Sequence, residues 1–165
     1  MSLGAAETGE GPGPGMSMEA GGVILVIEDS DEDFEATIRA FRKAEVRREV
    51  RRCADGDEAM DYLHRRGAFA DAASSPRPAL VMLDLNMPGT DGREVLEEMK
   101  RDESTRMTPV IVLTTSSSPR DIEACYEAGA SSYIIKPVDF ERFSRSIRSL
   151  AEYWFGTVAL PRGRA

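Results

Sequence analysis

Carboxylate side chains follow two short apolar segments of this sequence, where they could bind a metal ion together. Glu28 and Asp29 come directly after the first segment, and Asp84 comes directly after the second. Carboxylates that meet without a partner repel one another, and a divalent cation relieves this repulsion. A small cluster of hard oxygen ligands suits Mg²⁺. We expect Asp29 and Asp84 to bind the ion directly, Glu28 to bind it through a water molecule, and Asn86 to contribute its backbone carbonyl.

A hydroxyl and an ammonium group accompany two further apolar segments. Thr114 ends one of them, and Lys136 comes directly after the other. A hydroxyl donor and a compact cation suit the equatorial oxygens of a phosphoryl group. An aspartate can act as a nucleophile and form an aspartyl phosphate. Asp84 is therefore the candidate phosphoacceptor, with Thr114 and Lys136 as its catalytic neighbours, provided that the four segments end at one place.

The segments beside these residues have the pattern of buried parallel strands. Each is short, apolar and largely β-branched, as expected for a strand that is covered on both faces. A fifth and weaker segment carries Val50 between charged residues, which is typical of an exposed edge strand. The expected strands are residues 23–27, 49–53, 79–83, 110–113 and 132–135.

Amphipathic helical patterns fill the gaps between these strands and follow the last one. Ser30 and Asp31 are candidate caps of the first helix, and Gly129 is the expected stop of the fourth. Strands that alternate with helices indicate right-handed βαβ crossovers. The predicted fold class is α/β, with a doubly wound five-stranded parallel sheet of order 2-1-3-4-5 and five helices. The apolar helical positions are Phe34, Ile38 and Phe41; Ala59, Met60 and Leu63; Val95, Leu96 and Met99; Ile122, Cys125 and Tyr126; and Phe143, Ile147, Leu150 and Trp154.

This topology predicts that the chemical groups meet. In open parallel sheets, sites form beyond the carboxyl ends of the strands, at the point where the strand order reverses. Here that point lies between the first and third strands, which are followed by Glu28 and Asp84. The carboxylates, Thr114 and Lys136 are therefore expected at one edge of the sheet.

Length and charge narrow the choice of function. The chain has 165 residues, enough for one domain, and a formal net charge of -8. An acidic chain is a poor partner for nucleic acid or for anionic lipid. No apolar run approaches the ~20 residues that cross a bilayer, so we expect no membrane partner and a cytoplasmic location. We divide the chain into a flexible N-terminal tail (residues 1–22), a folded domain (23–153) and an apolar C-terminal extension (154–165).

The domain resembles the receiver domain of two-component response regulators. The matching segments are VILVIEDS, LVMLDLNMPGTDG, PVIVLTT and YIIKP, in the order and spacing of that family. The segment LAEYWFGTVALP is similar, more narrowly, to the stand-alone regulators associated with phytochrome-type sensor kinases. The likeness spans the chain from Val23 to about Tyr153.

The resemblance implies a flavodoxin-like receiver fold and a phosphorelay signalling protein that is not an enzyme. It implies that Asp84 takes a phosphoryl group from a sensor histidine kinase, with Mg²⁺ as the cofactor. The narrower likeness implies a kinase of the phytochrome type. Thr114 and Tyr133 would be switch residues, and the bond between Lys136 and Pro137 would be cis. Few residues follow the fifth helix, so we expect the output to be contact with a downstream protein or onward transfer of the phosphate.

The apolar side chains near the C-terminus suggest a homodimer. Trp154, Phe155, Val158 and Leu160 form a segment that must cover or meet an apolar surface. We expect this segment to extend an interface built on the fourth and fifth helices and the fifth strand.

Two other functions of the same fold do not fit these residues. A flavin protein would place a phosphate-binding loop rich in glycine and hydroxyl groups where residues 28–33 are mostly acidic. An aspartyl phosphatase of the haloacid type would need a second aspartate where Asn86 stands. A protein-binding module that is not phosphorylated remains the alternative.

Overall fold

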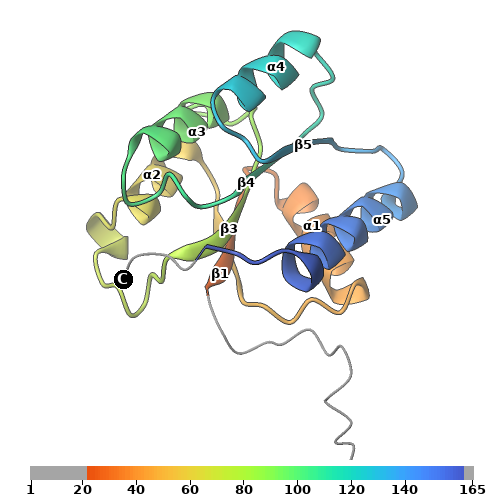
Figure 1. Cartoon of the computed structure of the whole chain (residues 1–165), viewed down its shortest axis with the longest axis horizontal. Coiled ribbons are helices and arrows are strands. Elements are labelled where there is room, and N and C mark those ends of the chain that lie inside the picture. Colours follow the sequence, from red (N-terminus) through yellow and green to blue (C-terminus); the bar gives the residue numbers. More distant parts are fainter. Residues whose placement is uncertain (1–21, 162–165) are drawn as a thin grey trace, which may run out of the picture.

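The computed structural model describes residues 22–161, in which one parallel sheet has helices on both faces (Figure 1). Gly22 is the only described residue of the predicted N-terminal tail, and residues 162–165 also lie outside the described part. The strands are β1 (Val23–Ile27), β2 (Val50–Cys53), β3 (Pro78–Leu83), β4 (Val110–Thr114) and β5 (Ser132–Ile135). The helices are α1 (Asp31–Lys43), α2 (Gly56–Leu63), α3 (Gly92–Arg101), α4 (Pro119–Glu127) and α5 (Phe140–Ala151), with a 3₁₀ turn η1 (Gly67–Phe69) and a π-helical turn η2 (Glu152–Thr157).

The strand order β2-β1-β3-β4-β5 confirms the predicted fold class. All neighbouring strands pair in parallel, and β2 forms one edge of the sheet, as its charged sequence predicted. The register pairs Ile27 with Leu83, and Leu83 with Val112. It also pairs Thr114 with Ile135 at the end of β5. The carboxyl ends of β1, β3, β4 and β5 therefore lie along one edge of the sheet.

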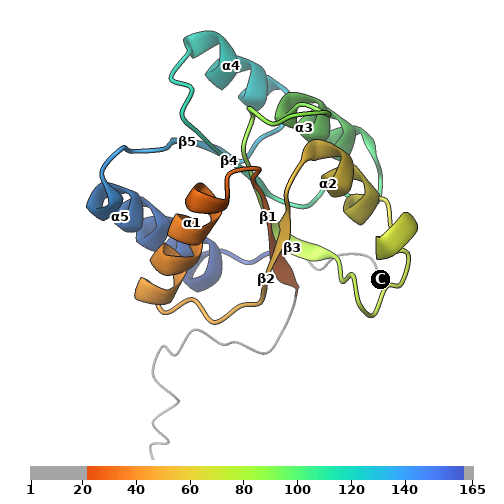
Figure 2. The ribbon, with the colours of Figure 1, turned by 180° about the vertical axis from the view of Figure 1, so that it is seen from behind.

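Two apolar cores lie on the two faces of the sheet. Side chains alternate along β1, so that Leu25 and Ile27 belong to one core while Ile24 and Val26 belong to the other. The first core packs under α2, α3 and α4, and the second packs under α1 and α5 (Figure 2). Because every residue of β1 is buried, this strand fixes the centre of the molecule and the position of the residues that follow it.

The helices begin at side-chain caps close to the ends of the strands. Ser30 accepts a hydrogen bond from the backbone N–H of Asp33, and so caps α1 three residues after β1 ends. Asp91 and Ser118 cap α3 and α4 in the same way. An N-terminal cap satisfies a backbone donor that has no partner within the helix. The loops from β1 to α1 and from β4 to α4 are therefore short, and their side chains have defined positions.

The segment after α5 differs from the predicted continuous helix. The apolar repeat reaches Trp154, but α5 ends at Ala151 and the chain continues as the π-helical turn η2. Trp154 and Phe155 are half-buried against the second core, and Arg48 lies 4.8 Å above the centre of the Phe155 ring. This part of the C-terminal extension therefore packs against the second core of the same chain. Across residues 22–161, no helix is long and apolar enough to cross a membrane.

Candidate functional site

Four strands deliver the predicted site residues to one edge of the sheet. Glu28 follows β1, Asp84 follows β3, Thr114 ends β4, and Lys136 follows β5. Backbone hydrogen bonds continue the sheet beyond the strand ends, because the Asp84 N–H donates to the Ile27 carbonyl at 3.0 Å. The Lys136 N–H similarly donates to the Thr114 carbonyl at 2.7 Å. Asp84 and Lys136 are thus held by the same backbone hydrogen bonds that build the sheet.

The Lys136 ammonium joins three carboxylates. Its Nζ lies 2.8 Å from Glu28 Oε2 and 3.3 Å from Asp84 Oδ2, as the convergence of strand ends predicts. The third partner is Asp33, whose Oδ2 lies 2.9 Å from Nζ. Asp33 belongs to the first turn of α1 and was not among the predicted site residues. Its only signal in the sequence is its place in the acidic run after β1.

Burial controls the charge of this cluster. Removal from water raises the pKa of Glu28 to about 7, and the neighbouring Lys136 opposes this rise. Burial also lowers the pKa of Lys136, but hydrogen bonds to Glu28 and Asp33 outweigh it and raise that pKa above the ordinary lysine value. Lys136 is therefore held as an ammonium, while burial favours the protonated form of Glu28 more than water does.

The three predicted acidic ligands lie close enough to share one cation. Glu28, Asp29 and Asp84 each offer a carboxylate oxygen, and these oxygens lie within 4.8 Å of one another. Two of the three carboxylates are buried, so their mutual repulsion is poorly screened. Hard oxygen donors of this kind suit a divalent cation such as Mg²⁺. The residues present therefore fit the ion that the sequence predicted.

Asn86 is the remaining predicted metal ligand. Its backbone N–H donates a hydrogen bond to Asp84 Oδ1 across 3.3 Å. This contact orients one oxygen of the Asp84 carboxylate. The proposed role of the Asn86 carbonyl as a metal ligand stays a prediction.

The hydroxyl of Thr114 is a buried donor without an acceptor. Thr114 is fully buried, and within residues 22–161 its Oγ1 has no hydrogen-bond partner. A buried polar atom without a partner costs free energy, and such atoms are rare in folded proteins. The unused hydroxyl lies at the carboxyl end of β4, beside the strand that leads to Asp84. It fits a site that lacks one acceptor until a further group is bound.

Tyr133 is held beneath α4. Its ring is half-buried against the first core, and its hydroxyl donates to the backbone carbonyl of Ser116 across 2.9 Å. Ser116 lies two residues beyond Thr114, so the two predicted switch residues are tied to the same loop. The switching roles of Thr114 and Tyr133 stay predictions.

The prediction of a cis peptide bond before Pro137 is wrong. The described part of the chain contains no cis peptide bond, so Lys136 and Pro137 are joined in the trans form. The trans form is the more stable one for most bonds that precede proline.

Comparison with known sequences identifies relatives across most of the chain. Residues 24–148 match the family described as the response regulator receiver domain. Response regulator Rcp1 of Synechocystis is 36% identical over 139 residues, which cover 84% of this chain and 92% of Rcp1. The probable methanogenesis regulatory protein FilR2 of Methanothrix harundinacea is 37% identical over 81% of this chain and 84% of FilR2.

Solved structures give the same result. The phosphorylated cyanobacterial phytochrome response regulator RcpA is 37% identical and superposes with a TM-score of 0.80, covering 86% of this chain and 99% of RcpA. The Mn²⁺-bound form of Rcp1 is 35% identical with a TM-score of 0.79, and the match covers 86% of this chain and 99% of Rcp1. Both are response regulators whose sheets and helices correspond to those described above.

Proposed function

This chain belongs to the response regulator receiver family, and from that membership we propose that Asp84 accepts a phosphoryl group from a sensor histidine kinase beside a bound Mg²⁺. The chain is a signalling protein rather than an enzyme. The observation that carries the proposal is the position of the Lys136 ammonium, which touches both the buried Asp84 and the buried Glu28. A cation fixed beside a carboxylate nucleophile suits the transfer of a negatively charged group.

The transfer itself needs few protein groups. One oxygen of the Asp84 carboxylate attacks the phosphorus of a phosphohistidine, so that an O–P bond forms while the N–P bond breaks. The electron pair of the broken bond stays on the imidazole nitrogen, which then takes a proton from solvent. Lys136 and the Thr114 hydroxyl bind phosphoryl oxygens on the modified Asp84. When bound, Mg²⁺ offsets the negative charge of the phosphoryl oxygens and of the surrounding carboxylates.

The choice of kinase rests on the relatives. RcpA is a phytochrome response regulator, and a relative from R. palustris that is 38% identical functions in red-light signalling. We therefore propose a kinase of the phytochrome type. The choice of metal rests on the carboxylate oxygens and on Rcp1, which was solved with Mn²⁺.

Phosphorylation can be measured directly. The protein is incubated with acetyl phosphate and Mg²⁺, and its intact mass is recorded beside those of Asp84→Asn and Asp91→Asn. Asp91 is a matched control because it caps α3. We expect the parent and Asp91→Asn to gain one phosphoryl group and Asp84→Asn to gain none. A gain by Asp84→Asn would show that another residue is the acceptor.

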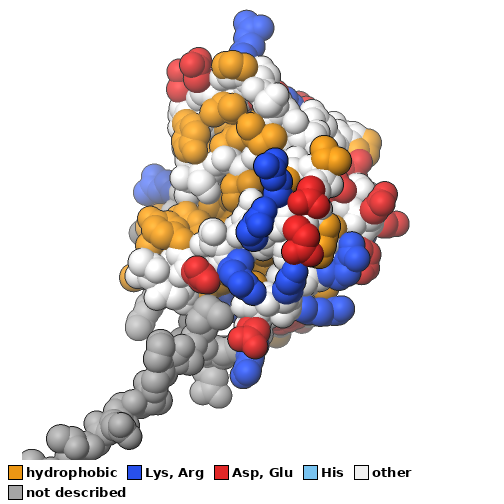
Figure 3. All heavy atoms as spheres, turned by 90° about the vertical axis from the view of Figure 1, so that its right-hand side faces the viewer, with side chains coloured by type: hydrophobic (Ala, Val, Ile, Leu, Met, Phe, Trp, Pro, Cys, Tyr) orange, Lys and Arg blue, Asp and Glu red, His pale blue; other side chains and the backbone are white. Residues whose placement is uncertain are grey.

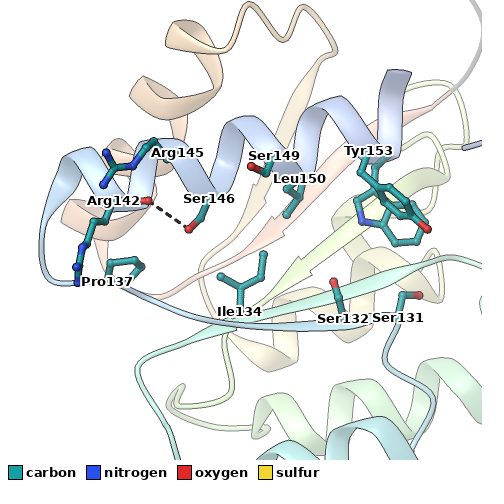
Figure 4. A pocket seen from close by; sticks show the side chains of 11 residues that line it. Ser131, Ser132, Ile134, Pro137, Arg142, Arg145, Ser146, Ser149, Leu150 and Tyr153 are labelled. Atoms are coloured by element: carbon teal, nitrogen blue, oxygen red, sulfur yellow. Dashed lines mark hydrogen bonds between the residues drawn. The ribbon is translucent and has the colours of Figure 1, made fainter. Parts of the chain in front are cut away.

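We also propose that two copies of the chain associate through α4, β5 and α5. Tyr126, Ile135 and Tyr153 are large apolar side chains of this region that are about half exposed. A groove of about 790 Å³ runs between β5 and α5, with Ile134 and Leu150 along it and Tyr153 at one end (Figure 4). On the side of the molecule that lies at the right of Figure 1, hydrophobic side chains gather beside a row of basic side chains (Figure 3). A second copy would cover this apolar surface.

The dimer is tested by solution mass. Tyr153 and Met107 are 52% and 51% exposed, but Met107 lies in the loop before β4. We expect light scattering to give the mass of two chains for the parent and for Met107→Arg, and of one chain for Tyr153→Arg. A one-chain mass for the parent at micromolar concentration would contradict the interface.

A further inference from the structure

Asp33 binds the lysine that a phosphoryl group on Asp84 would need. An ammonium has three N–H donors, and in this structure the Lys136 ammonium faces three carboxylates. The distances from Nζ are 2.8 Å to Glu28, 2.9 Å to Asp33 and 3.3 Å to Asp84. A phosphoryl group on Asp84 brings three further acceptor oxygens to the same place. Phosphorylation turns the Asp84 carboxylate into an acyl phosphate, so Lys136 exchanges its contact with Asp84 for one phosphoryl oxygen. It can bind a second phosphoryl oxygen only if it releases Glu28 or Asp33.

Glu28 and Asp33 differ in how easily Lys136 can release them. The side chain of Glu28 is 5% exposed, whereas that of Asp33 is 46% exposed. A buried carboxylate that loses its cation keeps an unpaired charge in a dry environment, which is costly. Asp33 would instead regain water, because it lines an open cavity of about 340 Å³ together with Lys136. Asp33 is therefore the partner that Lys136 can leave at the lowest cost.

The N-terminus of α1 stabilises the Asp33 carboxylate both with and without its contact to Lys136. Asp33 lies in the first turn of α1, where its backbone N–H is already bound by the Ser30 cap. Negative charge is favourable at a helix N-terminus. The carboxylate thus stays stabilised after its ammonium partner has gone, and the helix itself need not move.

We propose that Asp33 is a positioning residue that holds one N–H donor of Lys136 while Asp84 is unmodified and yields it to a phosphoryl oxygen when Asp84 is phosphorylated. This inference rests on the proposed function of Asp84. It assigns to α1 a part in setting how strongly the site retains a phosphoryl group. Loss of the Asp33 charge removes the competitor, so the site binds a phosphoryl group more strongly.

The test uses beryllium trifluoride, an analogue of the phosphoryl group, at saturating Mg²⁺. Its dissociation constant is measured by fluorine NMR for the parent, Asp33→Asn, Glu32→Gln and Asp33→Glu. Glu32 is the matched control, because it is an exposed acid that lines the same cavity and, within residues 22–161, makes no hydrogen bond or ion pair with Lys136. We expect Asp33→Asn to bind about fivefold more tightly than the parent. Glu32→Gln should change by less than about twofold, and Asp33→Glu should return toward the parent.

Two results would overturn the inference, and they are distinguishable. If the parent binds the analogue and Asp33→Asn binds it no more tightly than Glu32→Gln does, Asp33 does not compete for Lys136, while the function of Asp84 stands. If the parent does not bind the analogue at all, the proposed function fails and the role of Asp33 fails with it. Thermal unfolding of all four proteins shows whether a change in affinity is only a change in folding.

Discussion

Arg93 in the first turn of α3 binds Asp121 in the first turn of α4. The Nη2 and Nε atoms of the guanidinium lie 2.9 and 3.1 Å from the same carboxylate oxygen. The other oxygen of Asp121 accepts a hydrogen bond from the Ser116 hydroxyl across 2.6 Å. The Ser116 carbonyl in turn accepts the hydroxyl of Tyr133. A continuous set of contacts therefore joins α3, α4 and the loop that follows Thr114.

Asp121→Asn should weaken this connection at neutral pH but not in acid. The Ser116 hydroxyl and then Arg93 lower the pKa of Asp121, so its contribution to stability is present above the ordinary aspartate range and is lost as pH falls through the lowered value. We expect the variant to lose on the order of 1 kcal/mol of unfolding free energy near neutral pH. Urea unfolding at neutral and acidic pH measures this, with Glu123→Gln on the exposed side of α4 as the control. A loss that is equal at both pH values would contradict the role of the charge.

Thr114→Val should stabilise the unmodified protein. The Thr114 hydroxyl is buried without a partner in the described part of the chain, and an apolar group of similar shape removes that cost. We expect the free energy of unfolding to rise by about 1 kcal/mol. Thr105→Val is the matched control, because the buried Thr105 hydroxyl donates to the Met99 carbonyl at 2.8 Å. That variant should lose stability, and a loss of similar size in Thr114→Val would show that its hydroxyl has a partner.

Binding of a divalent cation should strengthen as pH rises. Burial raises the pKa of Glu28 from 4.5 to about 7. A carboxylate must lose its proton before it can bind a cation, either directly or through water. We expect the affinity for Mg²⁺ to be about tenfold weaker near pH 6 than near pH 8, measured by titration calorimetry. In Glu28→Gln this dependence should disappear.

The same raised pKa predicts the opposite trend for the stability of the cation-free protein. The folded state holds the Glu28 proton more tightly than the unfolded chain does, so this contribution to stability is complete below about pH 4.5 and is lost as pH rises through about 7. Urea unfolding in the presence of a chelator measures it. Parallel trends for cation affinity and stability would show that another group controls the pH dependence.

The fold and most of the site were predictable because they depend on local patterns. Each apolar run became a strand, and β5 begins and ends where the sequence indicated. Glu28, Asp84 and Lys136 follow strands of the sheet, a parallel sheet brings such strand ends together, and Lys136 contacts both carboxylates. Their meeting therefore follows from topology alone.

Asp33 and Arg93 could not be predicted in this way. Asp33 reaches Lys136 from a helix, across 103 positions of sequence, and the contact depends on how α1 packs against the sheet. Arg93 and Asp121 connect the starts of two helices, whose relative position is set by the packing of the first core. The sequence pattern also did not predict where α5 ends. The spacing from Leu150 to Trp154 suits a continuous α-helix, but the chain forms a π-helical turn there.

Gly92→Ala should displace Asp84 itself. A β-carbon added at Gly92 would overlap the backbone carbonyl oxygen of Asp84 and would lie 2.7 Å from the Cα atom of Leu85. Because these are backbone atoms in a packed region, the loop that carries Asp84 would have to move, at a cost of about 2 kcal/mol in unfolding free energy. We expect slower phosphorylation by acetyl phosphate as well as lower stability in urea. Gly156→Ala is the control, because nothing lies within 4 Å of its added carbon, and equal behaviour of the two variants would show that the loop tolerates the larger residue.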